Sequence, residues 1–503
     1  MGEKLNPSRG GSTKKSSGPA ARRKRRPARP VARTQAAKKL NKKQLIGLIL
    51  GAIVFFIPLL VDIPNLSTSG ERMLSIFLLA IVFWITEPIS LTATAVLVIL
   101  LEVLMVSQGA LTDPTGGDPA LAETLLPASS YFAALANPVI ILFLGGFMIA
   151  DGAEKYGMDR NLAAVMLKPF SDSARQTTLG LMLITGILSM FMSNTATTAT
   201  MFAVVAPLLR LLKSPKARTG LALSIPVAAN VGGIGTPVGS PPNAITVAAL
   251  AENGIQISFV DWMIMAIPFM LILLIGSWLF LCYFFIPKEE TIHVEMDSNW
   301  NTSRNAKIFY FIAGLTIVLW MTEPLHGISS NTVGFFPVVA LLALNVMDGN
   351  DVKKLDWPVL WLVSGGIALG TGVGATGLSE WLVSSIPWNS FSPLLILVVI
   401  GSIGFGIANL ISHSAAANLL VPVAVALAVS LDGINTITVA VVVGIACSLG
   451  MSMPISTPPN AIAYATGEIK VSEMAFAGLV IGIVGTALLI FVVPFYWELI
   501  GMV

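Results

Sequence analysis

The sequence predicts an all-α polytopic membrane protein with about 11 transmembrane helices, arranged as two inverted repeats with two re-entrant hairpins and two broken helices. Three observations predict this fold. The 503 residues are 55% hydrophobic and only 11% charged, whereas soluble proteins are about 25% charged. Apolar stretches of about 20 residues, the length that crosses a bilayer, recur along the chain. Finally, the same short motifs occur in the same order in both halves.

The apolar stretches leave little room for soluble segments. Examples are 44–62, 73–86, 89–106, 262–287, 306–321, 331–347 and 474–500. Both cysteines, Cys282 and Cys447, fall within apolar segments, so neither a disulfide framework nor a thiolate metal site is expected. The composition therefore indicates a membrane protein without a prosthetic group.

The N-terminal segment 1–43 is predicted to be a disordered basic cytoplasmic tail. It holds half of the 30 Lys and Arg residues, including the run at 22–26, and Glu3 is its only acid. A segment of high net charge and low hydrophobicity stays disordered. Because it directly precedes an apolar span, we expect it to contact anionic membrane lipid and no nucleic acid. A plastid transit peptide, also acid-poor and rich in Ser and Arg, is the alternative.

The remaining basic residues predict the topology of a multi-pass protein of the cell (inner or plasma) membrane. Segments without Lys or Arg alternate with segments that contain nearly all the rest. With a cytoplasmic N-terminus, this pattern fits eleven crossings if 176–213 and 391–431 each enter and leave on one side. The first of these regions then lies on the cytoplasmic side and the second on the outer side.

The internal similarity indicates inverted repeats, at 71–287 and 306–503. The matching motifs are Trp84-Ile-Thr-Glu-Pro88 with Trp320-Met-Thr-Glu-Pro324, Gly145-Gly146 with Gly365-Gly366, Ser193-Asn194-Thr195 with Ser412-His413-Ser414, and Ser240-Pro-Pro-Asn-Ala-Ile245 with Thr457-Pro-Pro-Asn-Ala-Ile462. The first half has an additional loop at 108–135. An odd number of crossings, five, separates Glu87 from Glu323, so the halves are inverted. This architecture is typical of secondary transporters, whose sites lie between the repeats near the middle of the membrane.

Two apolar regions are predicted to be helical hairpins. Each arm of 176–213, which divides at Ser193, is short for a full crossing, and the same holds for 391–431, which divides at Ser412. Ser, Asn and Thr are preferred N-caps, so each tip can begin a helix that presents free backbone N–H groups. Two helix N-termini that meet form two anion sites, one for each carboxylate of a dianion.

Two Gly- and Pro-rich runs, 233–243 and 453–460, are predicted to interrupt helices. Such breaks expose carbonyl oxygens, which are tolerated within a membrane only where they line a cavity or bind a ligand. Carbonyl and hydroxyl oxygens suit a hard cation such as Na⁺. The residues that we expect to shape and support these loops are Thr236, Ser240, Pro241, Asn243, Thr457 and Asn460.

With these tips and loops, the sequence over 44–503 resembles the divalent anion:sodium symporter (DASS) family, specifically its bacterial sodium-dependent dicarboxylate transporters. The resemblance implies a single transporter unit with interleaved scaffold and transport subdomains, a homodimer and an elevator mechanism. It implies small di- and tricarboxylates as substrates, such as succinate, malate and fumarate, with Na⁺ as the coupling ion. By resemblance, the sodium ligands come from Ser189, Ser193, Asn194 and Gly239 for one ion and from Ala408, Ser412, Ser456 and Pro458 for another. The residues that it assigns to the substrate are Asn194, Thr195, His413 and Ser414.

The second tip departs from the family pattern, because it reads Ser-His-Ser and not Ser-Asn-Thr. Histidine has no oxygen to offer to Na⁺, and it is a cation when protonated. His413 can replace a Na⁺ with its own charge, couple transport to a proton, or donate a hydrogen bond to the substrate. A Na⁺-independent dicarboxylate exchanger and an H⁺-coupled carrier are therefore alternatives to symport.

Other functions were weighed against transport of a carboxylate. An enzyme is not expected, because the short Gly232-Gly233-Ile234-Gly235 fragment lacks the strand and acidic ligand of a nucleotide site. A channel is disfavoured by the matched hairpins. Transporters of sulfate, of arsenite, or of Na⁺ against H⁺ remain rivals, although a cation exchanger should carry a buried Asp. The sequence leaves open the particular anion, the Na⁺ stoichiometry, and the role of Glu87 and Glu323, for which we favour a structural or interfacial role over a proton relay.

Overall fold

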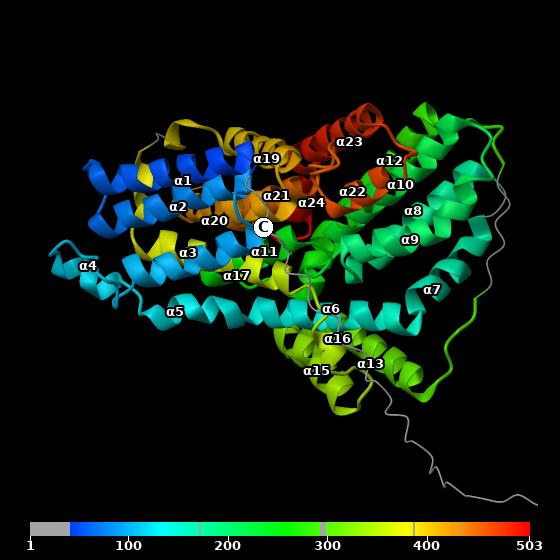
Figure 1. The fold of residues 1–503 in the computed structure, drawn as a ribbon, viewed down its shortest axis with the longest axis horizontal. Coiled ribbons are helices and arrows are strands. Elements are labelled where there is room, and N and C mark those ends of the chain that lie inside the picture. Colours follow the sequence, from blue (N-terminus) through cyan, green and yellow to red (C-terminus); the bar gives the residue numbers. More distant parts are fainter. Residues whose placement is uncertain (1–40, 171–172, 292–297, 386–387, 432) are drawn as a thin grey trace, which may run out of the picture. The chain divides into compact units, whose positions relative to one another are not determined.

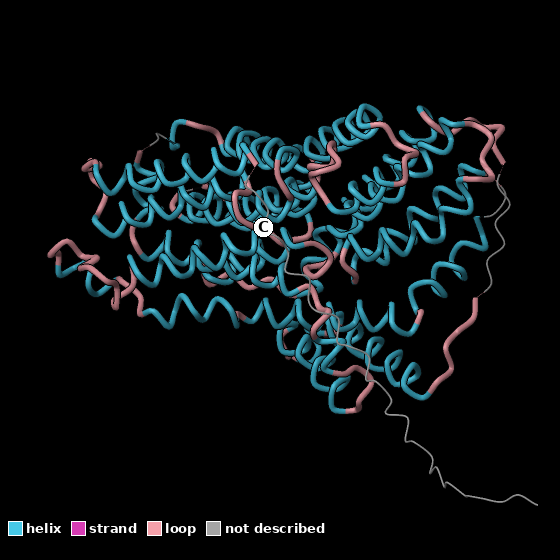
Figure 2. The backbone as a smooth tube through the Cα atoms, viewed as in Figure 1, coloured by secondary structure: helices cyan, strands magenta, loops and turns pink. Residues whose placement is uncertain are grey.

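The protein is all-helical over the part of the chain that the structure describes. The computed structural model describes residues 41–170, 173–291, 298–385, 388–431 and 433–503, and within them no strand occurs (Figure 2). This confirms the predicted all-α class. The predicted disordered tail lies outside the described residues up to position 40.

The order of the helices along the chain can be followed in Figure 1. The first twelve are α1 (Lys42–Leu60), α2 (Thr68–Thr86), α3 (Leu91–Met105), α4 (Pro119–Thr124), α5 (Ala128–Ala133), α6 (Pro138–Tyr156), α7 (Met158–Leu167), α8 (Ala174–Phe191), α9 (Asn194–Leu209), α10 (Pro215–Gly232), α11 (Pro241–Glu252) and α12 (Phe259–Phe284). The others are α13 (Arg304–Met321), α14 (Glu323–His326), α15 (Ser330–Ala343), α16 (Gly349–Val352), α17 (Trp357–Ala375), α18 (Leu378–Ser384), α19 (Pro393–Leu410), α20 (His413–Val429), α21 (Thr436–Ser448), α22 (Pro458–Ala465), α23 (Val471–Phe491) and α24 (Val493–Leu499). Short 3₁₀ turns are η1 (Ala134–Ala136), η2 (Lys168–Phe170), η3 (Gly233–Gly235) and η4 (Trp388–Ser390).

Serine side chains set the start of many of these helices. Each accepts a hydrogen bond from a backbone N–H of the first turn, which otherwise has no partner within the helix. The capping serines are Ser67, Ser90, Ser173, Ser193, Ser214, Ser258, Ser303, Ser329, Ser392 and Ser412. At α12 the cap is reciprocal, since Asp261 also accepts from the Ser258 backbone. The helix boundaries therefore follow from local sequence.

Seven segments in the described residues are long and apolar enough to cross a membrane. The span predicted at 474–500 corresponds to one of these segments, Val471–Leu499, in which Val492 separates α23 from α24. One predicted loop differs in the structure. The segment 108–135, expected as a loop, contains α4 and α5. The count of eleven crossings stays a prediction.

The helices are interrupted at the four places that the sequence predicts. The first apolar region breaks between α8 and α9, the second between α19 and α20, and the Gly- and Pro-rich runs separate α10 from α11 and α21 from α22. The arms α8 and α9 pack on α10, and the arms α19 and α20 pack on α21. Each hairpin therefore lies against the broken helix of its own half.

Helices of one half also pack against helices of the other. α6 packs closely on α15, below it in Figure 1, and α17 packs on α3. The motif glycines lie in these contacts, since a Cβ at Gly145 would overlap the Gly334 carbonyl and one at Gly365 would overlap Ala95. Small residues allow such close approach between helices in a membrane. The inverted relation of the repeats itself stays a prediction.

Candidate substrate and cation site

Both hairpin tips start a helix at the predicted serine. The Ser193 side chain accepts a hydrogen bond from the Ala196 backbone N–H at 3.2 Å, and α9 begins at Asn194. The Ser412 side chain accepts from the Ala415 N–H at 3.2 Å, and α20 begins at His413. Each tip thus ends in the positive end of a helix dipole, where an anion is stabilised.

One cavity of about 130 Å³ unites both tips and both loops. The predicted residues that line it are Ser193, Asn194, Thr195, Gly239, Ser240, Pro241, Ser412, His413, Ser414, Ser456, Thr457 and Pro458. Lys and Arg do not occur among its lining residues, all of which the structure describes. Any anion held here depends on helix N-termini, hydroxyl and amide groups, and His413.

Behind the first tip, oxygen atoms converge on the Asn194 amide group. One end of this amide lies 2.6 Å from the Ser189 hydroxyl oxygen. The same end of the amide lies 3.2 Å from the Ala229 carbonyl oxygen and 3.0 Å from that of Gly239. If the amide nitrogen of Asn194 points toward these three oxygens, it donates hydrogen bonds to them. If the amide oxygen points toward them, it forms a cluster of four oxygens with the Ser189 hydroxyl and the Ala229 and Gly239 carbonyls. Such a cluster is the ligand set of a hard cation, so the residues present fit Na⁺.

The second tip differs from the first in chemistry as well as in sequence. The His413 Nε2 atom lies 3.0 Å from the Gly450 carbonyl oxygen, and the side chain is buried. Ala408, predicted to offer its backbone to a cation, is buried against Gly450, where a Cβ would come within 2.5 Å of the Ala408 side chain. An imidazole nitrogen therefore lies beside the Gly450 carbonyl oxygen at the second tip, where the first tip has an amide group.

The two Pro-Pro-Asn motifs make matching hydrogen bonds. The Asn243 side chain donates to the carbonyls of Gly233 and Thr236, at 2.8 and 2.7 Å. The Asn460 side chain donates to those of Met451 and Met453, at 2.7 and 3.1 Å. Each asparagine thereby ties the start of its helix to the loop in front of it.

Hydroxyl groups complete the loops. Thr236 donates to the Met190 carbonyl and accepts from the Gly239 N–H at 3.1 Å. Ser456 closes a tight turn, since its hydroxyl accepts from the Met453 N–H at 3.1 Å. Together with Ser189, Ala408 and the two asparagines, Thr236 lies behind the cavity wall, not on it. That any of these residues binds substrate or Na⁺ stays a prediction.

The sequence reasoning missed several residues of this cavity. They are Phe143, Phe147, Asn230, Asp356 and Val359. Val238 and Pro459 also line the cavity and belong to the predicted runs 233–243 and 453–460. Asn230, a buried polar residue in an apolar helix, carried a signal that could have been noticed. The two phenylalanines carried none, because an aromatic residue in an apolar span is ordinary.

A second cavity, of about 140 Å³, lies between α11, α17, α18 and α20. It is lined by two carboxylates, Glu252 and Glu380, and by none of the predicted site residues. The cavity between the tips is therefore the better candidate for an anion.

The comparisons with known proteins agree with the fold and the motifs. Residues 38–503 match the family described as "Sodium:sulfate symporter transmembrane region". The sodium-dependent dicarboxylate transporter SdcS of Staphylococcus aureus strain USA300 is 28% identical to this chain over 507 aligned residues, which cover 93% of this chain and 94% of that protein. The SdcS protein of strain bovine RF122 / ET3-1 gives the same identity and coverage.

A solved structure supports the fold at lower sequence similarity. The crystal structure of the Alcanivorax borkumensis YdaH transporter, described as having an unusual topology, aligns with a TM-score of 0.51 at 14% identity. The alignment covers 73% of this chain and 87% of that one. The family match spans the whole helical part, so this chain is a multi-pass membrane transporter and not an enzyme, and it belongs to the sodium:sulfate symporter family, the divalent anion:sodium symporters.

Proposed function

We propose that this protein carries small dicarboxylates of the succinate, malate and fumarate class across the cell membrane, coupled to Na⁺. One observation carries the proposal: a single cavity is lined by both hairpin tips and both Pro-Pro loops. Two helix N-termini at this cavity suit a ligand with two carboxylates. The name of the SdcS relatives, sodium-dependent dicarboxylate transporters, supports the same substrate and ion.

In this proposal the substrate is bound by neutral donors. Thr195 and Ser414 supply hydroxyls from the first turns of α9 and α20, and backbone N–H groups of those turns supplement them. Neutral donors together with helix dipoles hold a carboxylate less tightly than a bidentate Arg does. A carrier benefits from this, because it must also release its substrate.

The coupling ion is assigned to the oxygen cluster of Ser189, Asn194, Ala229 and Gly239. Asn194 lies between this cluster and the cavity. A Na⁺ bound there would orient the amide oxygen toward the ion, which leaves the amide nitrogen to donate to a substrate carboxylate. Binding of the ion would thereby prepare the substrate site, which is a physical basis for coupling.

We also propose an elevator mechanism. Apart from Asp356 at the start of α17, the polar residues of the cavity come from α8–α11 and α19–α22, whereas Phe143, Phe147 and Val359 come from α6 and α17. A largely apolar wall can slide past a polar site with few directional bonds to break. The first group would be the transport subdomain and the second part of the scaffold. A homodimer and a cytoplasmic N-terminus that contacts lipid complete the proposal.

Na⁺-independent exchange is the second candidate, and it rests on the position of His413 at the second tip, beside the Gly450 carbonyl. A neutral imidazole makes this contact as well as a protonated one, and only the protonated form would supply the positive charge that a cation otherwise brings. H⁺ coupling through His413 and transport of sulfate or another divalent anion are further variants of the same site.

Reconstitution into liposomes distinguishes these functions. Labelled succinate uptake would be followed with and without an inward Na⁺ gradient, and then with unlabelled succinate inside. Concentrative uptake only with the Na⁺ gradient supports symport. Uptake that requires internal dicarboxylate and ignores Na⁺ supports exchange. No succinate movement in either format contradicts the dicarboxylate assignment and directs the assay to sulfate.

A further inference from the structure

The candidate cavity contains one charged residue that the proposed binding scheme does not use. Asp356 lines it, at the residue before α17. All other lining groups are apolar or uncharged polar side chains, apart from the imidazole of His413. A carboxylate at a site for a dianion works against binding, since like charges repel. Its presence therefore calls for a physical explanation.

Asp356 stands at the N-cap position of α17, but its side chain makes no regular capping hydrogen bond. Burial raises the pKa of its carboxyl, and the nearby Val359 backbone N–H, which bonds to the Asp356 carbonyl at 3.0 Å, offsets this in part. No ion pair within the described residues includes Asp356. When ionised, its carboxylate therefore acts on the cavity without a paired cation.

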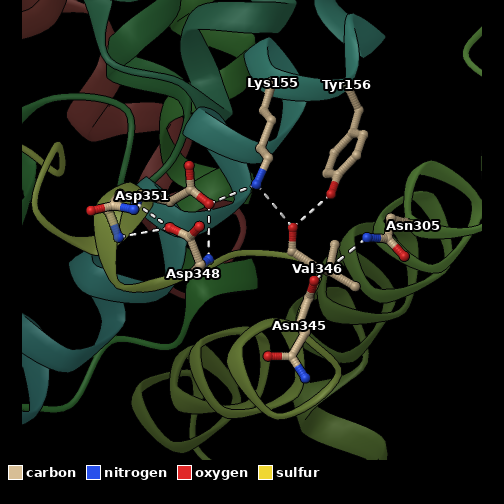
Figure 3. Close-up of polar contacts among 8 residues, drawn as sticks. Lys155, Tyr156, Asn305, Asn345, Val346, Asp348 and Asp351 are labelled. Carbon is tan, nitrogen blue, oxygen red and sulfur yellow. Dashed lines mark hydrogen bonds and ion pairs between the residues drawn. The ribbon is translucent and has the colours of Figure 1, made fainter. Parts of the chain in front are cut away.

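Hydrogen bonds tie the segment in front of Asp356 to α6. Lys155 at the end of α6 donates to the Asp351 carboxylate at 2.6 Å and to the Val346 carbonyl at 3.1 Å (Figure 3). Tyr156 donates to the same carbonyl at 2.6 Å. These bonds tie the segment in front of α17 to α6, and they commit the Lys155 ammonium to Asp351.

Asp356 and the proposed binding groups come from different elements. Asp356 and Val359 belong to α17 and its start, whereas the tips begin α9 and α20. All of them line the same cavity of about 130 Å³. A third carboxylate on a substrate would therefore add a further negative charge to a cavity that already contains the Asp356 carboxylate.

We propose that Asp356 is a specificity-determining residue that restricts this site to dianions by repelling a third carboxylate. The inference rests on the proposed function and narrows its substrate class. Specificity of this kind comes from a repulsive element against the wrong ligand, not from a new contact to the right one. Succinate is repelled less than a tricarboxylate because it carries two negative charges and not three.

A matched pair of inhibitors tests the proposal on the full-length protein in liposomes. Glutarate and tricarballylate differ by one carboxylate on the middle carbon of a five-carbon chain. Each would compete with labelled succinate at about pH 8, where both are ionised. The wild type is expected to bind glutarate at least tenfold more tightly than tricarballylate.

The variant Asp356→Asn should reduce the ratio of the tricarballylate inhibition constant to the glutarate inhibition constant by about five- to tenfold, because tricarballylate then inhibits more strongly. The KM for succinate should change by less than twofold. Asp356→Glu retains the charge and should keep the discrimination. Glu154→Gln, on α6 and outside the cavity lining, is the control and should leave the ratio of the two inhibition constants unchanged.

A salt titration of the wild type tests the same repulsion without any variant. Raising choline chloride from about 20 to 500 mM should bring the inhibition constants of tricarballylate and glutarate closer together, because salt screens repulsion at an open site.

Each contrary result has a distinct meaning. An unchanged ratio in Asp356→Asn, with succinate transport intact, overturns the inference alone. So does an equal change for glutarate and tricarballylate, or a change confined to the Na⁺ half-saturation. A wild type that transports no dicarboxylate overturns both the proposed function and the inference.

Discussion

The Asn230 side chain donates to the Asn460 side-chain oxygen over 3.2 Å, which joins α10 of the first half to the Pro-Pro-Asn motif of the second. Both side chains are buried. Asn460 uses its own amide nitrogen to hold the carbonyls of Met451 and Met453. A single residue therefore connects the second loop to itself and to the opposite half of the protein.

Asn460→Ala should destabilise the protein and reduce transport. It leaves buried carbonyls without donors, and each unsatisfied group costs about 1–3 kcal/mol. Thermal unfolding in detergent, followed by size-exclusion of the heated sample, measures the loss. Asn253→Ala is the control, since Asn253 bonds only within its own exposed turn. Equal stability of the two variants would contradict the assigned supporting role.

Ser189→Ala should weaken the dependence of uptake on Na⁺. The hydroxyl lies 2.6 Å from the Asn194 amide and 2.8 Å from the Ala229 carbonyl, so its loss removes one oxygen of the cluster. The Na⁺ concentration for half-maximal uptake should rise about 5- to 20-fold, the equivalent of about 1–2 kcal/mol. Thr185→Ala removes a buried hydroxyl one turn away that bonds only to its own helix, and should leave the Na⁺ titration unchanged. If both variants shift it equally, the cluster does not bind the ion.

His413→Asn should bring the second tip closer to the chemistry of the first. An amide oxygen beside the Gly450 carbonyl can coordinate a cation, whereas the imidazole nitrogen cannot offer an oxygen. We expect the variant to depend more steeply on Na⁺, with a higher Hill coefficient for uptake. The control is His326→Asn, at a histidine outside the cavity lining. An unchanged Na⁺ dependence would place the role of His413 in substrate binding alone.

Gly372→Ala should destabilise the protein, whereas Gly374→Ala on the same helix should not. A Cβ at Gly372 would come within 2.7 Å of a Glu102 carboxylate oxygen and of the Met73 sulfur, while a Cβ at Gly374 would meet nothing within 4 Å. Overpacking of this kind lowers the free energy of unfolding by about 1–3 kcal/mol. Replacing Gly by Ala at an open position in a helix raises it by up to about 1 kcal/mol. Comparing the two melting temperatures checks the packing of α17 on α3. The reverse order of stabilities would contradict it.

The Lys155–Asp351 pair should make stability depend on acid pH. Partial desolvation acts to raise the pKa of Asp351, but the hydrogen bonds from Lys155 and the Asp348 backbone outweigh it, so this pKa lies below its ordinary value. A depressed carboxyl pKa stabilises the fold above the unfolded-state pKa of about 3.9, and this stabilisation is lost as the pH falls through the lower folded-state pKa. Asp351→Asn should therefore lower the Tm at pH 7 by about 1–2 °C, since partly exposed pairs contribute little.

The difference between wild type and Asp351→Asn should shrink as the pH falls from about 4 through the lower folded-state pKa, because the wild-type carboxyl becomes protonated first in the unfolded and then in the folded state. Glu123→Gln, at an exposed position on α4, is the control and should follow the wild type at every pH. A difference that stays constant down to pH 3 would show that the loss does not come from the charge of Asp351.

The sequence by itself determined where the helices begin and break. Ser193 and Ser412 cap the helices that follow them, and Pro241 and Pro458 open α11 and α22, because capping and proline geometry act within a few residues of the chain. The repeated motifs likewise indicated which tips and loops should belong to one site. These signals are local or periodic, so a linear reading can find them.

Tertiary structure alone decided which atoms meet. The approach of the Ala229 and Gly239 carbonyls to Asn194, and of the Gly450 carbonyl to His413, joins backbone groups that every residue carries, so no sequence pattern marks them. Asp356 reached the cavity only because α17 packs beside α20 and α6, contacts made between residues distant in the chain. Burial and proximity are properties of the packed helices, and for that reason the charge on the cavity wall could not be predicted from its place in the sequence.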